Sequence, residues 1–360
     1  MRTPVVLLTG VDAASMAGAM VSLQFDLPGA VAVRHEIDVE AQTLLRVVSD
    51  LSGVVETERI DLAHACVSCA IREDVVPTLE RLAATGRWQT IVAHLPVGAE
   101  ARQVCGVLAW DTRLARRLRI ASVVTALSGA GLADSLLGED LLVERGVQTS
   151  DDDRRGVGEV ACAMVEYADV VVLDGLEGEI DRDGWALVRT LARPDAAVVR
   201  GVVDLTADLV LSRRHQHGAT EAWAGNVLEA EAPQPAGSMV WRLDLRSEHA
   251  FDPVLLLDDI EVLGAGRHRS RGCFWLPTRP GDALAWDGAG GQLSIGLAEP
   301  WGRRRPFTRL LLIGLGTPPL HLIPEFDRLL APGATARATT GTATAEDGFE
   351  PWLGPIEGVA

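Results

Sequence analysis

The residues best suited to chemistry lie at positions 64–69, where the chain reads His64-Ala-Cys66-Val-Ser-Cys69. Two thiolates separated by two residues can bind one metal ion, and His64 is a candidate third ligand. Two sulfurs and one imidazole nitrogen suit Zn²⁺ better than a hard cation. A complete structural site would need a second pair of ligands, so a loop with two small, half-buried thiols is an equally good interpretation.

A second candidate site lies where an apolar run ends at Gly10 and a helical pattern begins. A phosphate-binding loop would read G-x-x-x-x-G-K-[ST] here, with a lysine on the terminal phosphates and a hydroxyl on magnesium. Ser15 stands at the second glycine and Met16 at the lysine. Ala17 stands at the hydroxyl, and Asp12 would place a negative charge beside the phosphates. The helix start could still attract an anion, but we do not expect this loop to catalyse phosphoryl transfer.

The composition excludes several kinds of chemistry. All 33 basic residues of the 360-residue chain are arginine, which rules out a phosphate-loop lysine, a Schiff base and a Ser–Lys dyad. The net charge of −17 argues against broad binding to nucleic acid or anionic lipid, so any such contact must be local. Five cysteines do not suggest a disulfide framework. No apolar run reaches the length of a membrane span, and we expect a cytoplasmic protein without membrane contact.

One dense basic triplet, Arg303-Arg304-Arg305, follows Trp301 and is the candidate partner-binding surface. An exposed hairpin loop is the alternative. Trp275 and Trp286 lie nearby in the sequence, and for these two we favour core positions. The His215-Gln-His217 segment is better explained as a solvated linker than as a metal site.

The pattern of elements predicts how these sites are positioned. Over residues 1–201, short apolar β-branched runs alternate with alanine-rich helical segments, which favours α/β architecture with a doubly wound parallel sheet. Ligands of such sheets bind at the carboxyl ends of the strands. We interpret residues 202–236 as a helix-containing linker and 237–330 as a small α+β domain with a Gly-rich hairpin. The Ala-, Thr-, Gly- and Pro-rich residues 331–360 are expected to be a disordered tail.

Together these segments resemble the CobW-type branch of the P-loop GTPases, which includes zinc- and cobalt-linked metallochaperones. Leu8-Thr9-Gly10 matches the family's opening strand and loop. Cys66-Val-Ser-Cys69, followed by Arg72 and Asp74, resembles its G-C-x-C-C-T-L-R-x-D-L motif. The longest match lies in the carboxyl domain of the family, at residues 269–280 (RSRGCFWLPTRP) and 286–291 (WDGAGG). The resemblance implies a P-loop-NTPase-like sheet followed by a CobW C-terminal domain.

The chain departs from the family where nucleotide would bind. The phosphate loop lacks its lysine and threonine, and the guanine-reading N-K-x-D is replaced by Asp174-Gly-Leu-Glu177. The middle cysteine of the metal motif is Ser68. Gly10, Asp12, Ser15, Ala17 and Asp174 therefore mark a degenerate nucleotide site. We expect no catalytic residues, little role for GTP and magnesium, and zinc as the candidate cofactor.

An actinobacterial subgroup of this family shows a similar loss of nucleotide motifs. Resemblance to it implies a non-catalytic adaptor that recruits a ribosome hibernation factor to the small ribosomal subunit under zinc limitation. Two alternatives stay open. The chain could be a GTP-binding zinc metallochaperone, or a zinc sensor in which metal at Cys66, Cys69 and His64 switches partner binding.

Overall fold

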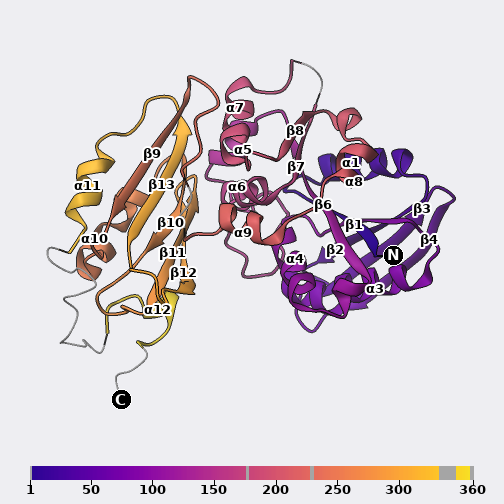
Figure 1. Ribbon diagram of the computed structural model, residues 1–360, viewed down its shortest axis with the longest axis horizontal. Helices are drawn as coiled ribbons and strands as arrows, with labels where there is room; N and C mark the ends of the chain where they lie inside the picture. Colours follow the sequence, from indigo (N-terminus) through magenta and orange to yellow (C-terminus); the bar gives the residue numbers. More distant parts are fainter. Residues whose placement is uncertain (1, 176–177, 228–230, 332–345, 357–360) are drawn as a thin grey trace.

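Two β-sheets organise the computed structural model, which describes residues 2–175, 178–227, 231–331 and 346–356 (Figure 1). The amino-terminal sheet has the strand order β4-β3-β2-β5-β1-β6-β7-β8. Its strands are β1 (Thr3–Thr9), β2 (Ala30–Asp38), β3 (Thr43–Asp50), β4 (Gly53–Asp61), β5 (Thr90–His94), β6 (Leu118–Ser128), β7 (Val170–Asp174) and β8 (Ala197–Arg200).

The six strands from β2 to β8 in this order are parallel to their neighbours. They are mostly buried because helices cover both faces, which is why the sequence shows continuous apolar runs rather than alternation. The hairpin of β3 and β4 adds two antiparallel strands at one edge. We did not expect this hairpin as a pair, because β4 is largely exposed and its sequence is polar.

Helices pack on both faces of this sheet, and α1 and α8 lie on the opposite face from α3 (Figure 1). The helical elements are α1 (Ala13–Asp26), α2 (Val67–Ala70), the π-helix η1 (Ile71–Val75), α3 (Val76–Thr85), α4 (Ala101–Trp110), the 3₁₀ turn η2 (Leu114–Arg116), α5 (Leu132–Leu137), α6 (Val157–Tyr167), α7 (Arg182–Leu191), the 3₁₀ turn η3 (Val202–Asp204), α8 (Ala207–Ser212) and α9 (His217–Ala224). Helix α5 ends at Leu137, because Gly138 takes an extended conformation.

The carboxyl-terminal sheet is antiparallel, in the order β12-β11-β10-β13-β9. Its elements are β9 (Val240–Ser247), α10 (Pro253–Gly264), β10 (His268–Phe274), β11 (Asp282–Ala289), β12 (Gln292–Pro300), β13 (Thr308–Leu315), α11 (Leu322–Arg328) and α12 (Glu350–Leu353). One face packs on α10, α11 and α12 around Phe251, Phe274 and Trp286. The other face turns toward α5, α6 and α7 of the first domain, where Leu311 and Ile313 share a core with Leu187 (Figure 1).

A buried ion-pair network joins the two domains. Glu166 of α6 accepts hydrogen bonds from Nε and Nη2 of Arg269 at 3.0 and 2.8 Å, and Nε of Arg271 lies 3.2 Å from the same carboxylate. All three side chains are at most 2% exposed. Burial disfavours the charge on Glu166, but the two guanidinium groups outweigh it and hold the pKa of Glu166 below its usual value. The second domain is therefore fixed to α6 by charge as well as by apolar packing.

The end of the chain differs from the expected disordered tail. Residues 332–345 and 357–360 lie outside the described part, but residues 346–356 fold back on the second domain. Asp347 accepts a hydrogen bond from Nε of Arg279 at 2.9 Å, and Phe349 is fully buried. The expectation of disorder was wrong for this segment, because a low-complexity run precedes an apolar anchor that fills the core of the carboxyl domain.

The predicted fold class is confirmed: a large, mostly parallel sheet is followed by a separate antiparallel α+β domain. Within the described ranges, none of the helices has the length and apolar character needed to span a membrane.

Candidate functional site

The junction of β1 and α1 brings most of the predicted nucleotide-site residues together. Gly10 follows β1, and a Cβ atom at this position would lie 2.3 Å from the carbonyl oxygen of Ala126, so only glycine fits beside β6. Helix α1 begins three residues later, at Ala13. Asp12 is its N-cap, and its Oδ1 accepts a hydrogen bond from the Ser15 N–H at 2.7 Å. A carboxylate of the chain itself therefore lies at the helix start, where a phosphate would bind.

The next residues point into the protein. Ser15 and Met16 are 2% and 0% exposed, and Met16 packs in the core with Leu8 and Leu23. Ala17 lines a cavity. Asp174, at the end of β7, lies beside α1, since a Cβ atom on Gly18 would be 3.9 Å from its Oδ2. The position of the family's lysine is thus a core position in this chain. Leu176 and Glu177 of the altered guanine motif lie outside the described residues.

A cavity of about 280 Å³ lies at the carboxyl ends of β2 and β5, next to the start of α1. This is the edge at which parallel sheets bind ligands. Two histidines line it, His35 of β2 and His94 at the end of β5, together with Arg34 and Gln148. Sequence analysis missed both histidines. The available signal was that the buried run 90–94 ends in His94, and that His35 follows the apolar run 30–33 by two residues.

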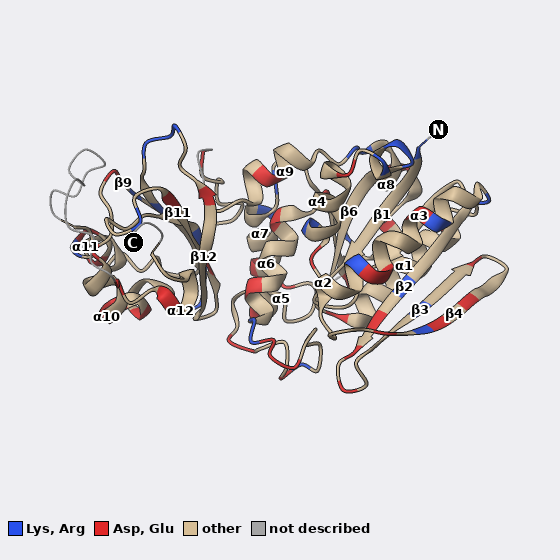
Figure 2. Ribbon diagram, turned by 90° about the horizontal axis from the view of Figure 1, so that it is seen from below, with Lys and Arg blue, Asp and Glu red and all other residues tan. Residues whose placement is uncertain are grey.

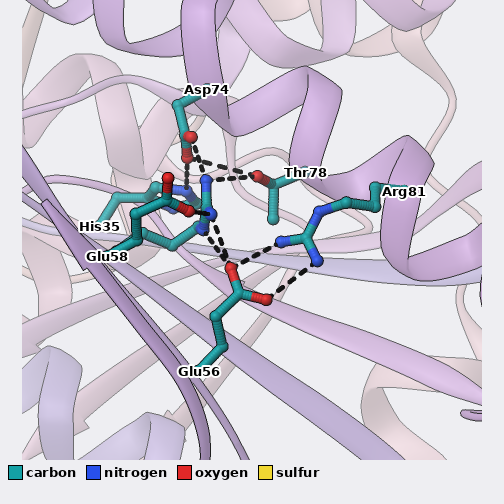
Figure 3. Close-up of polar contacts among 7 residues, drawn as sticks. His35, Glu56, Glu58, Asp74, Thr78 and Arg81 are labelled. Carbon is teal, nitrogen blue, oxygen red and sulfur yellow. Dashed lines mark hydrogen bonds and ion pairs between the residues drawn. The ribbon is translucent and has the colours of Figure 1, made fainter. Parts of the chain in front are cut away.

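The ring of His35 is held by a carboxylate (Figure 3). Its Nε2 lies 3.0 Å from Oδ1 of Asp74, which sits on the π-helix η1. Burial disfavours ionised Asp74, but the hydrogen bond from His35 and the charges of His35 and Arg46 lower its pKa below the usual value. The other ring nitrogen, Nδ1 of His35, is buried without a hydrogen-bond partner.

Arg46 of β3 connects the His35–Asp74 pair to carboxylates of the β3–β4 hairpin, among them Glu56 and Glu58 (Figure 3). Its guanidinium group contacts Asp74 and Glu58, and its Nη2 donates to Oε1 of Glu56 at 2.6 Å. Arg81 of α3 binds the same Glu56 at 2.9 Å. Arg46 is the cross-strand partner of His35, so the hairpin positions Asp74, and through it His35, from the neighbouring strand.

The ring of His94 is uncharged at neutral pH and can donate or accept a hydrogen bond. Burial is the main reason that its pKa is lowered to about 4, and its Nδ1 is buried without a hydrogen-bond partner. His94 is the register partner of Arg34, whereas His35 is the next residue of β2, so the two imidazoles lie on opposite faces of the sheet. A carboxylate behind an imidazole, as Asp74 lies behind His35, is a common partner of zinc-binding histidines.

The two predicted thiol ligands, Cys66 and Cys69, lie just before η1, the element that carries Asp74. Cys66 is the N-cap of α2, and its Sγ accepts a hydrogen bond from the Cys69 N–H at 3.3 Å. Cys69 is 8% exposed, and its hydrogen bond with Cys66 together with burial raises its thiol pKa. Helix α2 continues directly into η1, which carries Asp74. The side chain of His64 is exposed, and across the described residues no group of three or more His, Cys, Asp or Glu is arranged to hold a metal ion.

The predicted partner-binding arginines lie between β12 and β13 of the second domain. Arg303 and Arg305 are exposed, and Arg304 donates to Glu299 at 3.3 Å and to the Pro300 carbonyl at 3.2 Å. Trp301 beneath them is 3% exposed. Trp275 and Trp286 are fully buried core residues, as we expected. The triplet is therefore part of a loop in which Arg303 and Arg305 are exposed and the preceding Trp301 is buried.

Fold and geometry define a two-domain α/β protein with a cavity beside the β1–α1 junction and a pair of thiols at the start of α2. Residues 240–330 match the family model of the cobalamin synthesis protein cobW C-terminal domain. The match covers the carboxyl-terminal domain, and the amino-terminal sheet lies outside the matched residues.

The chain is similar to curated proteins over most of its length. It is 29% identical over 314 residues to a Mycobacterium tuberculosis protein named zinc chaperone Rv0106, covering 84% of this chain and 74% of that protein. It is 20% identical over 281 residues to the zinc-regulated GTPase metalloprotein activator 1 of Dictyostelium discoideum, covering 72% and 59%. Among solved structures, the Zn(II)-bound YjiA GTPase of E. coli is similar at 16% identity, covering 91% of this chain and 99% of that chain, with a TM-score of 0.37.

Proposed function

We propose that this protein is a zinc-linked adaptor of the CobW family that works by binding partners rather than by hydrolysing GTP. The observation that carries the proposal is the start of α1. Asp12 occupies the anion position of the helix, and Met16 is buried where the family has its lysine. Without the cation and the magnesium hydroxyl, little remains to stabilise charge on a transferring phosphoryl group.

The proposed partners are a ribosome hibernation factor and the small ribosomal subunit, with recruitment when zinc is scarce. Support comes from the resemblance to family members that have lost the same nucleotide motifs. The carboxyl domain supplies a candidate surface, since Arg303 and Arg305 are exposed beside a buried tryptophan. Arginine is enriched at energetically important interface positions.

Cosedimentation with purified small ribosomal subunits, with and without the hibernation factor, tests this proposal. We expect the chain to increase the amount of factor bound, and to do so without added GTP. Changing Arg303, Arg304 and Arg305 together to Ser should weaken recruitment while the melting temperature stays the same. An unchanged amount of bound factor would reject the adaptor function.

A second function, a GTP-binding zinc metallochaperone, is favoured by a different observation. Cys66 and Cys69 lie together at the start of α2, and two relatives carry names that refer to zinc. Zinc-stimulated GTP hydrolysis that is lost in Cys69→Ser would establish this function in place of the adaptor. Zinc at the same two thiols that changes partner binding without hydrolysis would instead support a sensor, which is compatible with the adaptor.

A further inference from the structure

Arginines gather at the amino-terminal edge of the parallel sheet, opposite the edge that carries the cavity. We call this set the amino-edge cluster; it consists of Arg2, Arg116, Arg117, Arg119 and Arg214. Figure 2 shows basic segments near the start of the chain and beside α8. The Thr3 N–H donates to the Arg117 carbonyl at 2.7 Å, which holds the segment before β1 against the segment before β6. Arg2, Arg119 and Arg214 line one hollow of about 140 Å³.

The positive charge of the cluster is only partly compensated. Arg117 lies 3.7 Å from Glu80, which also pairs with the neighbouring Arg113. In the part of the chain that the structure describes, the other four members of the cluster form no ion pair with a carboxylate. This contrasts with the chain as a whole, whose net charge is −17. Such a local excess of guanidinium groups attracts a polyanion.

The hollow also contains a buried polar atom without a partner. The side chain of His215 is 2% exposed and its Nδ1 lies 2.9 Å from Oδ2 of Asp169, so the ring is fixed. Its Nε2 is buried without a hydrogen-bond partner. Because buried polar groups are nearly always paired, this atom marks a place for a polar ligand atom. The polar H-x-H segment, which the sequence suggested to be a solvated linker, is thus part of a hollow lined by arginines.

An exposed aromatic ring adjoins the cluster. Trp110 is the last residue of α4 and is 86% exposed. The carboxylate of Asp111 accepts hydrogen bonds from the Arg113 and Leu114 N–H groups at 2.8 and 3.1 Å, so the chain turns from Trp110 directly into η2 and the arginines. A basic groove beside an exposed aromatic ring is the arrangement that binds single-stranded nucleic acid, with phosphates on the cations and a base stacked on the ring.

We propose that this face, formed by the amino-edge cluster and Trp110, binds a single-stranded segment of nucleic acid. The arginines bind successive phosphates, and Trp110 stacks on an unpaired base. An acidic protein would satisfy the arginines equally well but would have no need of a flat, exposed indole. The face is separate from the cavity and from Arg303–Arg305, so this inference stands apart from the adaptor proposal and from the nucleotide question.

Fluorescence anisotropy with labelled single strands tests the proposal on the full chain. The probes are RNA and DNA oligonucleotides of one sequence, about 12 nucleotides long, which falls within the range that a single-strand-binding domain covers. We expect saturable binding that weakens with salt. In the variant Arg116→Gln/Arg117→Gln/Arg119→Gln, the slope of log affinity against log salt should become shallower by about 0.7 for each arginine–phosphate ion pair that the substitutions remove.

Trp110 separates nucleic acid from other polyanions. Trp110→Ala should weaken binding of the oligonucleotides about tenfold, while Trp110→Phe should retain most of the affinity, because both rings can stack. The matched control is Arg182→Gln/Arg189→Gln, which removes two exposed arginines of α7 and should leave affinity unchanged. Preference for RNA over DNA would indicate contacts to the 2′-hydroxyl, and equal binding would indicate phosphates and stacking alone; both support the proposal.

Three outcomes would overturn it. The first is no saturable binding of either oligonucleotide at low salt. The second is equal loss of affinity in the Arg182/Arg189 control, which would mean that charge acts non-specifically. The third is binding of a polyglutamate peptide as tight as that of RNA with no effect of Trp110→Ala, which would assign the face to an acidic protein. None of these results would bear on recruitment of the hibernation factor by the second domain.

Discussion

Oδ1 of Asp12 lies 2.7 Å from the backbone nitrogen of Ser15, so the first turn of α1 is capped by a side chain of the chain itself. In a phosphate loop the same N–H groups face the phosphates of a nucleotide. A nucleotide at this junction would have to displace the cap and would bring phosphate charge next to a carboxylate. The geometry therefore supports a stable helix start at the expense of anion binding.

The cap leads to a prediction about stability. Asp12→Ala should lower the free energy of unfolding by about 1 kcal/mol, because the Ser15 N–H loses its acceptor. Asp12→Asn keeps an acceptor oxygen and should cost less. Urea denaturation of the three proteins measures the difference. Equal stability of the alanine variant and the unaltered chain would show that the cap contributes nothing.

The interdomain ion pair should be one of the most sensitive positions in the chain. Glu166→Gln leaves Arg269 and Arg271 buried without a full counter-charge, and we expect a loss of about 3–5 kcal/mol in unfolding free energy. Glu159→Gln on the same helix is the matched control. Burial raises the pKa of Glu159, and its Oε1 accepts a hydrogen bond from the Ser294 hydroxyl at 2.8 Å, so the neutral amide is a close replacement. The two variants should differ clearly in thermal and urea denaturation; similar losses would contradict a special role of Glu166.

The buried His94 predicts a pH dependence. Its pKa is lowered to about 4 in the folded state, whereas an unfolded histidine titrates near 6.5. Between these values the unfolded chain binds more protons, so stability is full above pH 6.5 and decreases as the pH falls toward 4. Between pH 7 and pH 5 the contribution is about 2 kcal/mol.

His94→Gln removes the titrating ring and should flatten this part of the stability curve. His321→Gln, at an exposed histidine, is the control and should leave the curve as it is. Urea denaturation at a series of pH values gives both curves. A His94 variant that loses stability between pH 7 and 5 as steeply as the unaltered chain would contradict the account.

The thiol pair predicts zinc binding that depends on pH. Because hydrogen bonding to Cys66 and burial raise the thiol pKa of Cys69, zinc must displace protons, and its apparent affinity should increase from pH 6 to pH 8. Cys69→Ser should abolish this binding, whereas Ser68→Ala, at the exposed residue between them, should not. Competition with a chromogenic zinc chelator measures the affinity. Zinc binding that survives in Cys69→Ser would place the metal elsewhere in the chain and contradict this prediction.

Much of the fold could be predicted from the sequence, and the reasons are local. Buried runs such as 90–94 have no polar alternation, and the Gly-rich turn at 288–291 identifies the β11–β12 hairpin. The hairpin of β3 and β4 was harder, because β4 is held by charged contacts of Arg46 with Glu56 and Glu58 rather than by an apolar face. No periodicity reveals such contacts.

The candidate site could be predicted only in part. Cys66 and Cys69 are close in sequence, so their spacing is sufficient to place them together. His35, Asp74 and His94 come from three separate segments, and only the order of strands in the sheet brings the two histidines to one cavity. The apolar neighbours of His94 made it resemble an ordinary strand end, and the charged neighbours of His35 made it resemble an exposed one. The amino-edge cluster likewise depends on the pairing of β1 with β6, which sets Arg2 beside residues 115–119.

The central claim is that this CobW-like chain does not use GTP. Isothermal titration of the metal-free protein with GTP and magnesium, repeated after adding zinc, tests it most directly. We predict no saturable heat at high micromolar GTP in either condition, because Asp12 and Met16 occupy the places of the phosphate and its lysine. Saturable binding in either titration would contradict the account, and the zinc metallochaperone function would then take precedence.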